Sequence, residues 1–395
     1  MEKVKLGEIA LLINGDRGKN YPSQEDITDD GEVPFVNAGH LNGKNIDYSD
    51  MNYISQEKYE KLSSGKFEKG DILYCLRGSL GKKAIVNDEV RGAIASSLVI
   101  IRPDRKKVNG DYLMFSLDAP TIREQLTKAN NGSTQPNLSA SSVREFRIEL
   151  PTLLVQKDVV EKLTKLQHVI EKRQNQINLL DKLVKARFVE LFGDLMENPF
   201  NWPMKTIADV SLFLKSGLSR KLSDEDIGLP VIRSGNIQNG QFIFDNVKYW
   251  YKDDPQGANT KDYVLEDGDV LVNFINSSSQ IGKTAIYRDT GRDCIYTTNI
   301  FRMKLADNCN EYYYNWFAMS DYYYRHLQNI IQPAVNQSSF TTVNFLKLQI
   351  PLPAKDKQNE FAEFVKQVDK SKVAIQKSLA ETQLLFDKLM QDYFG

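Results

Sequence analysis

Apolar side chains recur at alternating four- and three-residue intervals in two widely separated segments of the chain. This spacing averages 3.5 residues, which keeps one apolar stripe facing a partner helix and supercoils the pair left-handedly. Pro151 and Pro353 precede the two segments, as is common at helix starts, and Lys, Glu, Asp and Gln fill the other faces. We therefore predict coiled-coil helices over 151–195 and 353–395. The apolar seam positions are Val159, Leu163, Leu166, Ile170, Ile177, Leu180, Val184, Phe361, Val365, Val368, Ile375, Leu379 and Phe386.

The second predicted helix needs a partner that buries its seam. The simplest partner is the first helix, packed antiparallel to it. A helix of about 40 residues is about 60 Å long, and one turn of B-DNA spans about 34 Å. Three polar residues interrupt the two series, and each aligns with an apolar residue of the other helix: Arg173 with Ile375, Lys372 with Ile170, and Thr382 with Leu180.

The segments outside the helices have a different pattern. Short β-rich runs, such as 72–74, 98–101 and 270–272, are broken by Gly, Asn and Asp, which is typical of a mixed α/β domain with many turns. We predict such domains over 1–150 and 204–352, with a linker over 196–203. The predicted fold class is α+β, with two similar mixed α/β domains separated by two long antiparallel coiled-coil helices.

The two halves of the chain repeat each other, and a repeat of this kind governs the fold. Residues 81–85 (GKKAI) match 282–286 (GKTAI), and 67–73 (FEKGDIL) match 265–271 (LEDGDVL). The sequence match between the two halves continues through the P-x-x-x-x-Q pattern, at Pro151–Gln156 and Pro353–Gln358. It extends to Phe-Gly at 192–193 and 394–395. The offset grows from 196 to 202 residues, as small loop insertions would produce. The pattern predicts two copies of one unit with a pseudo-twofold axis.

A tyrosine-rich segment late in the second copy predicts one helix from Tyr312 to Gln328. Its aromatic rings could stack on nucleic-acid bases. However, Tyr112 and Arg123 align with Tyr314 and Arg325. We therefore prefer the interpretation that both copies carry this helix for core packing.

Two short stretches resemble motifs of nucleotide-binding enzymes and of adenine methyltransferases, but neither stretch matches its motif in full. Gly282-Lys283-Thr284 resembles the end of a phosphate-binding loop, G-x-x-x-x-G-K-[ST]. The position of the first glycine is Ser277, and the aligned copy has Lys83 in place of Ser or Thr. Residues 198–200 (NPF) lack the second proline of the adenine-methyltransferase motif, and no glycine-rich cofactor loop precedes them. We interpret them as part of the linker, with Trp202 anchoring the second domain.

Composition narrows the class of protein further. The 395 residues carry a net charge of −1, which gives no sign of a global basic surface. The three cysteines are far apart and the three histidines have no counterparts in the other copy, so we expect neither a metal site nor a disulfide framework. The chain shows no signal-peptide pattern and no apolar run long enough for a membrane span. We expect a cytoplasmic protein.

The duplicated domains, the two repeated helices, the P-x-x-x-x-Q pairs and the Phe-Gly pairs together resemble the specificity subunit of a type I restriction-modification enzyme. The resemblance covers the whole chain. It implies a non-catalytic protein with two target recognition domains, each reading half of a bipartite site in double-stranded DNA. It also implies that the helices fix the spacer between the half-sites and dock two methyltransferase subunits, which recruit restriction subunits. S-adenosylmethionine and ATP are then expected only in those partners.

The repeat also predicts which residues contact DNA. Scaffold positions should match between copies, whereas residues that read bases should be polar, exposed and different. Three loop pairs fit this pattern. The base-reading candidates are Asn37, His40, Arg77, Ser79, Gln135, Arg233, Asn236, Asn276, Ser278, Gln280 and Gln337. The phosphate-contacting candidates are Lys19, Lys82, Lys83, Arg220, Lys221 and Lys283.

A second interpretation remains open on sequence alone. The chain could be a coiled-coil adaptor whose end domains bind proteins. A DNA reader loses affinity steeply as salt rises, whereas a protein adaptor binds no duplex, so a salt titration of DNA binding separates the two.

Overall fold

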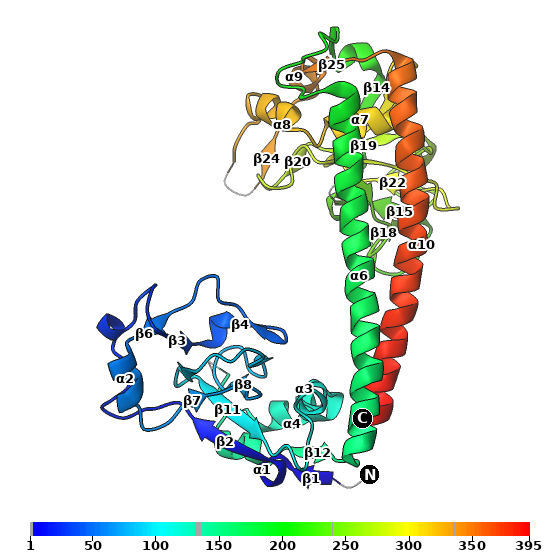
Figure 1. The fold of residues 1–395 in the computed structure, drawn as a ribbon. Coiled ribbons are helices and arrows are strands. Elements are labelled where there is room, and N and C mark those ends of the chain that lie inside the picture. The colour runs from blue at the N-terminus through cyan, green and yellow to red at the C-terminus, as the bar shows by residue number, and fades with distance from the viewer. Residues whose placement is uncertain (1–2, 131–135, 239, 335–336) are drawn as a thin grey trace. The chain divides into compact units, whose positions relative to one another are not determined.

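A computed structural model describes residues 3–130, 136–238, 240–334 and 337–395 of the chain (Figure 1). The chain divides into two compact units. Unit 1 comprises residues 1–174 and 377–395, and unit 2 comprises residues 175–376. Each unit therefore contains one α/β domain together with parts of two long helices, α6 (Leu153–Phe192) and α10 (Lys355–Phe394).

The α/β domain of unit 1 contains two four-stranded sheets. The first has the order β2-β11-β8-β9, and all of its neighbours are antiparallel. The second has the order β6-β3-β10-β7, in which β3 and β10 are parallel. The bounds are β2 (Ala10–Asn14), β3 (Val33–Val36), β6 (Tyr53–Ile54), β7 (Lys66–Phe67), β8 (Ile72–Cys75), β9 (Lys83–Ile85), β10 (Gly92–Ile94) and β11 (Leu98–Pro103).

Unit 2 repeats this topology, except that no strand among the described residues takes the place of β7. Its four-stranded sheet has the order β14-β23-β19-β21, and its three-stranded sheet has the order β18-β15-β22, with β15 and β22 parallel. Each strand occupies the place of its sequence match in unit 1, which confirms the predicted internal repeat. The bounds are β14 (Ser211–Ser216), β15 (Leu229–Ile232), β18 (Lys248–Trp250), β19 (Val270–Asn273), β21 (Thr284–Ile286), β22 (Ile295–Tyr296) and β23 (Ile300–Leu305).

Smaller elements complete both domains. A two-stranded pair leads into each long helix, β1 with β12 in unit 1 and β13 with β25 in unit 2. The bounds are β1 (Lys3–Lys5), α1 (Leu6–Ile9), β4 (Leu41–Asn42), β5 (Asn45–Ile46), α2 (Gln56–Lys61), α3 (Gly110–Ser116), α4 (Pro120–Ala129), α5 (Ala140–Arg144), β12 (Arg147–Glu149), β13 (Met204–Thr206), β16 (Ile237–Gln238), β17 (Gln241–Phe242), β20 (Ile275–Asn276), α7 (Glu311–Phe317), α8 (Asp321–Gln328), β24 (Ser338–Ser339), α9 (Thr342–Leu346) and β25 (Gln349–Pro351).

The predicted helix over 312–328 is two helices, so that prediction is wrong. α7 ends at Phe317 and α8 begins at Asp321, because Ser320 acts as the N-cap and accepts a hydrogen bond from the Tyr323 N–H at 3.2 Å. The core-packing interpretation is confirmed, since Tyr313, Tyr314 and Tyr323 are at most 1% exposed.

The alignment of the tyrosines also needs a correction of one residue. Asn109 is the N-cap of α3 and Asn310 is the N-cap of α7. The two caps therefore align Tyr112 with Tyr313 rather than with Tyr314. Both hydroxyl groups donate to the strand that precedes the long helix: Tyr112 to the carbonyl of Glu149 at 2.9 Å, and Tyr313 to the carbonyl of Pro351.

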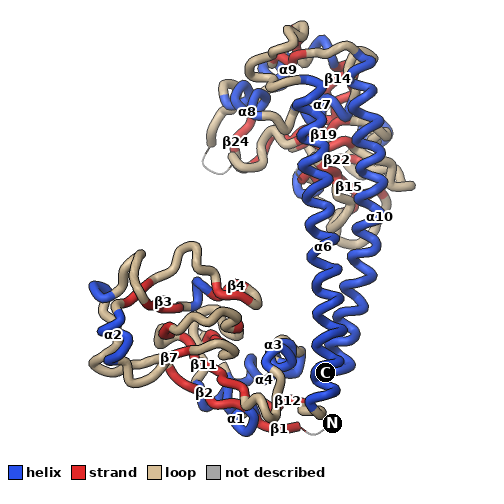
Figure 2. The backbone as a smooth tube through the Cα atoms, in the orientation of Figure 1, coloured by secondary structure: helices blue, strands red, loops and turns tan. Residues whose placement is uncertain are grey.

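In each unit, a stretch of α6 runs antiparallel to a stretch of α10 (Figure 2). Val159 and Leu163 share a core with Met390 and Phe394 in unit 1. In unit 2, the second half of α6 packs on the first half of α10 through Val184, Phe188, Phe192, Phe361, Val365 and Val368. Every predicted seam residue is buried or half-buried, as the heptad pattern requires. The predicted coiled coil is therefore confirmed.

A buried glutamine joins each helix to its domain in the same way. In unit 1, Gln156 Oε1 accepts from the Asn109 N–H at 2.8 Å, and Nε2 donates to the carbonyls of Lys107 and Pro151. In unit 2, Gln358 Oε1 accepts from the Asn310 N–H at 2.8 Å, and Nε2 donates to the carbonyls of Asn308 and Pro353. Both glutamines are 0% exposed. The glutamine of the repeated P-x-x-x-x-Q pattern thus attaches each long helix to the α/β domain of its own unit.

The linker after α6 is held by local hydrogen bonds. Asn198 adopts a positive φ of 45°, its Oδ1 accepts from the Trp202 N–H, and its Nδ2 donates to the Trp202 carbonyl. The indole Nε1 of Trp202 donates to the Phe192 carbonyl at 3.1 Å. The Asn198 side chain is therefore engaged in a turn, which supports the linker interpretation of residues 198–200.

Candidate nucleic-acid interface

The two Gly-Lys elements form equivalent turns between antiparallel strands. Gly81 (φ 78°) lies between β8 and β9, and Gly282 (φ 81°) lies between β19 and β21. A Cβ atom on Gly282 would lie 2.0 Å from Leu327 Cδ2, so the backbone angle and the packing both require glycine. A phosphate loop leads from a strand into a helix, whereas this turn leads into β21. The GKT sequence is therefore a structural turn.

In unit 1 the three predicted loops lie together. Lys82 Nζ donates to the Ala38 carbonyl at 2.9 Å, which joins the second loop to the first. The Gly78 N–H donates to the Pro136 carbonyl at 3.1 Å, which joins the second loop to the third. Gln135 of the third loop lies outside the described residues.

The same three loops meet in unit 2. Asn273, at the end of β19, donates through Nδ2 to the Ser234 carbonyl at 3.5 Å. Asn276 in β20 pairs with Ser338 in β24. The loop between Asn273 and Gly282 is three residues longer than its counterpart between Cys75 and Gly81. A shared scaffold therefore carries loop clusters that differ between the units.

Several base-reading candidates are engaged in closing their own turn. The expectation that His40 and Asn236 are exposed is wrong, since they are only 8% and 3% exposed. His40 Nδ1 accepts from the Asn37 N–H, and Asn37 Oδ1 accepts from the Gly39 N–H. Asn236 Oδ1 accepts from the Arg233 N–H, while its Nδ2 donates to two carbonyls. The polar identity of His40 and Asn236 is explained by this turn.

The remaining base-reading candidates differ in how free they are. The half-buried Arg233 donates through Nη2 to the Asn246 carbonyl at 2.6 Å. Asn276 and Gln280 are half-buried, and Asn276 Oδ1 accepts from the Ser277 N–H. Arg77, Ser79, Ser278 and Gln337 are exposed. Within the described part of the chain, no hydrogen bond or ion pair involves the Arg77 guanidinium, so this cation is available to a partner.

The phosphate candidates also divide into engaged and available side chains. The expectation of a surface role for Lys83 is wrong, because Lys83 is 5% exposed and its ammonium pairs with Asp118. Lys82 is held by the Ala38 carbonyl. Lys19 and Lys221 are exposed, and Lys283 is half-buried. No side-chain partner of Lys283 occurs among the described residues.

Arg220 is bound to an inaccessible carboxylate, which opposes its predicted role. Its Nη2 lies 2.6 Å from Asp254 Oδ2, and the Asp254 side chain is 0% exposed. Asp254 also accepts from the N–H groups of Gln256 and Ala258. The Arg220 guanidinium, helped by these backbone bonds, lowers the pKa of Asp254 to about 2.

We expect Arg220→Ala to lower the melting temperature by about 2–4 °C, because it leaves the Asp254 carboxylate without its ion partner. The adjacent Lys221→Ala is the matched control and should leave the melting temperature unchanged. A lowered carboxylate pKa stabilises the fold above its unfolded value, and this contribution is lost as pH falls from about 4 toward about 2. The difference between the two variants should therefore disappear in that range. Equal melting temperatures at neutral pH would show that Arg220 is free for another role.

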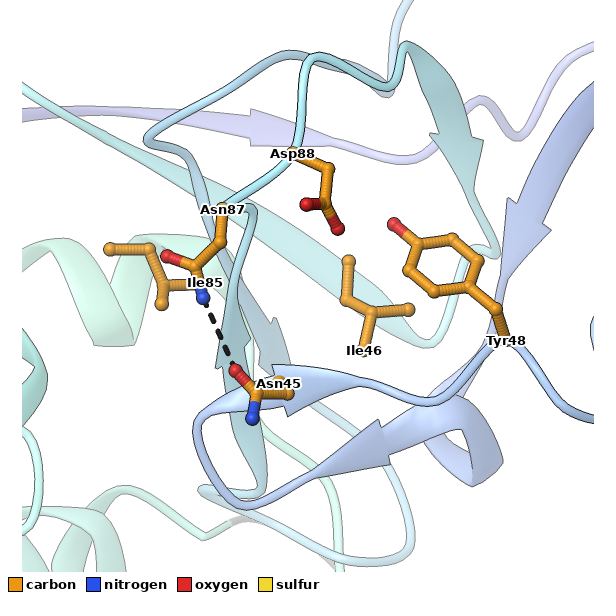
Figure 3. A pocket seen from close by; sticks show the side chains of 6 residues that line it. All are labelled: Asn45, Ile46, Tyr48, Ile85, Asn87 and Asp88. Atoms are coloured by element: carbon orange, nitrogen blue, oxygen red, sulfur yellow. Dashed lines mark hydrogen bonds between the residues drawn. The ribbon is translucent and has the colours of Figure 1, made fainter. Parts of the chain in front are cut away.

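A small polar pocket of about 190 Å³ lies beside the β4–β5 hairpin of unit 1. Figure 3 shows Asn87 donating to Asn45 Oδ1 at 3.2 Å on one side, with Tyr48 and Asp88 on the other. Burial raises the pKa of Tyr48. None of the predicted DNA-contacting residues that the structure describes lines this pocket. In unit 2, Phe242, which aligns with Ile46, packs on Tyr287 with ring centroids 5.1 Å apart.

The duplicated fold and its two loop clusters define a class of protein: a scaffold that presents two related polar surfaces. Its sequence matches the family model for the type I restriction modification DNA specificity domain twice, over residues 1–179 and 199–383. The chain belongs to this family, and its two α/β domains are the target recognition domains of a specificity subunit.

Curated relatives agree with this assignment. The MjaVIII specificity subunit of Methanocaldococcus jannaschii is 23% identical, with 93% of this chain and 86% of the relative covered. The EcoKI specificity subunit of Escherichia coli K12 is 20% identical, with 89% and 79% covered. A shorter match, to the putative MjaX specificity subunit of M. jannaschii, is 28% identical. It covers 45% of this chain and 41% of that relative.

Two solved structures share the fold. One is the S subunit of the type I restriction-modification system of M. genitalium, with a TM-score of 0.61, 15% identity, and 100% of this chain and 96% of that chain covered. The other belongs to a study of complex assembly in the type I system, with a TM-score of 0.55, 18% identity, and 100% and 97% covered. Among the described residues, no helix has the length and apolar character of a membrane span, and no three His, Cys, Asp or Glu side chains are grouped as metal ligands.

Proposed function

We propose that this chain gives a type I restriction-modification complex its DNA sequence specificity, with each α/β domain reading one half of a bipartite site. The chain itself is non-catalytic in this proposal. The domains read double-stranded DNA in the bacterial or archaeal cytoplasm, and partner subunits bring S-adenosylmethionine and ATP.

One observation carries the proposal: equivalent loops with different polar residues stand on equivalent scaffolds. Residues that only support the fold repeat, as Gly81 and Gly282 do, and as Gln156 and Gln358 do. The loop of Arg77 and Ser79 instead corresponds in the repeat to a longer loop that contains Ser278. Two half-sites of different sequence require this combination, since arginine can pair bidentately with guanine and short polar side chains suit other bases.

The helices support two further parts of the proposal. A chain with internal pseudo-twofold symmetry offers two equivalent faces, which suits two copies of one methyltransferase subunit. These would in turn recruit restriction subunits. Two readers at a fixed separation convert two weak half-site affinities into one strong affinity, provided that the spacer fits. Each helix has 40 residues, so each is about 60 Å long.

A pair of substitutions tests the division between reading and positioning. Arg77→Ala should relax the sequence preference at one position of one half-site, with a loss of discrimination of about 5–150-fold, the range expected for one bidentate base contact. Lys283→Ala should weaken binding to all sequences alike and reduce the salt slope by about one ion. The readout is the motif of methylated sites in genomic DNA, together with salt titrations of the purified complex.

Both variants keep their fold in this account, because neither side chain has a protein partner in the described residues. A uniform loss of binding for both would contradict the assignment of Arg77 to base reading. A protein that binds no duplex, alone or with its partner subunits, would favour the adaptor interpretation.

A further inference from the structure

Two cations interrupt the apolar seam between α6 and α10, and each is satisfied by the opposite helix. In unit 1, Arg173 Nη1 donates to the Ser378 carbonyl at 2.6 Å and to Thr382 Oγ1. In unit 2, Lys372 is 8% exposed, and its ammonium pairs with the carboxylate of Asp181. A cation in a seam is costly unless its hydrogen bonds and charge are matched, so these contacts discriminate between partners.

The contacts are not repeated by the internal symmetry. The aligned positions of Arg173 and Thr382 hold Ile375 and Leu180, and those of Lys372 and Asp181 hold Ile170 and Gln383. Each polar contact therefore occurs once and needs one residue from each helix. The apolar seam, by contrast, is similar in the two helices and does not distinguish them.

This asymmetry matters because a duplicated chain has an obvious competing state, in which like helices from two copies pair. If two α6 helices paired with the present geometry, Arg173 would meet Leu180 in place of Thr382. The two Arg173 side chains would also lie about 8 Å apart along the axis, at 1.5 Å per residue. If two α10 helices paired, Lys372 would face Gln383 and lose its carboxylate.

A slip of one heptad within the chain is opposed in the same way. It would place Arg173 opposite Ile375 or Leu389, and Lys372 opposite Gln174 or Phe188. Either slip keeps the apolar seam but leaves both cations without their partners. A single polar seam residue is known to fix register and partner number in coiled coils at some cost in stability.

We propose that the Arg173–Thr382 and Lys372–Asp181 contacts select pairing of α6 with α10 of the same chain, in one register, over pairing of like helices from two chains. The inference rests on the helix contacts and goes beyond the proposed DNA-reading function, so it stands or falls independently of DNA binding.

The test makes the two helices alike. A variant with Arg173→Ile, Thr382→Leu, Lys372→Ile and Asp181→Gln places at each position the residue of the aligned site. Replacing the buried Lys372 and the half-buried Arg173 by isoleucine removes two cations that are costly to desolvate. Circular dichroism should therefore show undiminished helix content and an unchanged or higher melting temperature. We expect the wild-type protein to have its monomer mass of 45.1 kDa in light scattering. The variant should be mainly dimeric at micromolar concentration, and two differently tagged copies, coexpressed, should copurify.

The matched control removes an ion pair at the edge of the same interface. Arg187 Nη2 lies 2.6 Å from Glu360 Oε1, outside the seam, so Arg187→Gln with Glu360→Gln should stay monomeric. A monomeric fourfold variant without tag exchange would overturn the proposal. Loss of folding in that variant would also overturn it, because the contacts would then supply stability rather than selectivity. Dimers of the control would show that any lost ion pair suffices.

Discussion

Replacement of Gln358 by leucine should cost about 3–5 kcal/mol of unfolding free energy, because it leaves several buried polar groups unsatisfied at about 1–3 kcal/mol each. The side chain is 0% exposed and makes three hydrogen bonds, to the Asn310 N–H and to the carbonyls of Asn308 and Pro353. Leucine has a similar volume but replaces none of these bonds. A loss of this size is a large part of the 5–15 kcal/mol that is typical of a domain.

The measurement is chemical denaturation, followed by circular dichroism. Gln376→Leu on the same helix is the control, since Gln376 is exposed and should change stability by at most about 0.5 kcal/mol. Gln156→Leu should reproduce the loss in unit 1, where the same three bonds are made. If Gln358→Leu unfolded at the denaturant concentration of the control, the repeated glutamine would not be the joint between helix and domain.

Features that follow from regular spacing could be predicted from the sequence. The heptad pattern gave the two helices and the faces that they bury, since one period of apolar residues has one solution in helical geometry. The repeat gave the equivalence of the two domains and the three loop pairs. It also showed that Lys283 belongs to a turn, because its copy at Lys82 has no phosphate-loop sequence around it.

The engagement of individual polar side chains could not be predicted, because it depends on residues far away in the sequence. Lys83 pairs with Asp118, and Arg220 pairs with Asp254. Their spacing to these partners has no period that a sequence pattern could reveal. His40 and Asn236 were misjudged for a related reason: residues that close a polar turn and residues that bind a ligand have the same composition.

The tyrosine alignment failed for a different reason. The run at 312–314 consists of three tyrosines, so a shift of one residue changes nothing in the apparent match. Only the helix cap at Asn310, which corresponds to Asn109, decides that Tyr313 is the counterpart of Tyr112.

Lengthening both long helices by one heptad should move the preferred spacer of the DNA target. The insertions belong after Gln174 in α6 and after Gln376 in α10, where unit 1 and unit 2 are divided and the seam runs through both helices. Seven residues add about 10 Å at 1.5 Å per residue and restore the heptad phase, so the seam stays continuous. About 10 Å corresponds to roughly three base pairs of B-DNA, at about 34 Å per turn of about 10 base pairs.

Three added base pairs also rotate the second half-site by about 100°, since one turn takes about 10 base pairs. The affinity of the best site should therefore fall, while its spacer length increases. Insertion into α6 alone is the control. Because α10 keeps its length, the Arg173–Thr382 and Lys372–Asp181 contacts cannot both stay in register, so this insertion should destabilise the protein without defining a new spacer.

The most direct measurement is the set of methylated sites in the genome of cells that carry the double insertion in place of the wild-type chain. The account predicts the same two half-site sequences, separated by a spacer about three base pairs longer. Methylation of the original sites at the original spacing, by a folded double-insertion protein, would contradict the claim that the paired helices set the distance between the two readers.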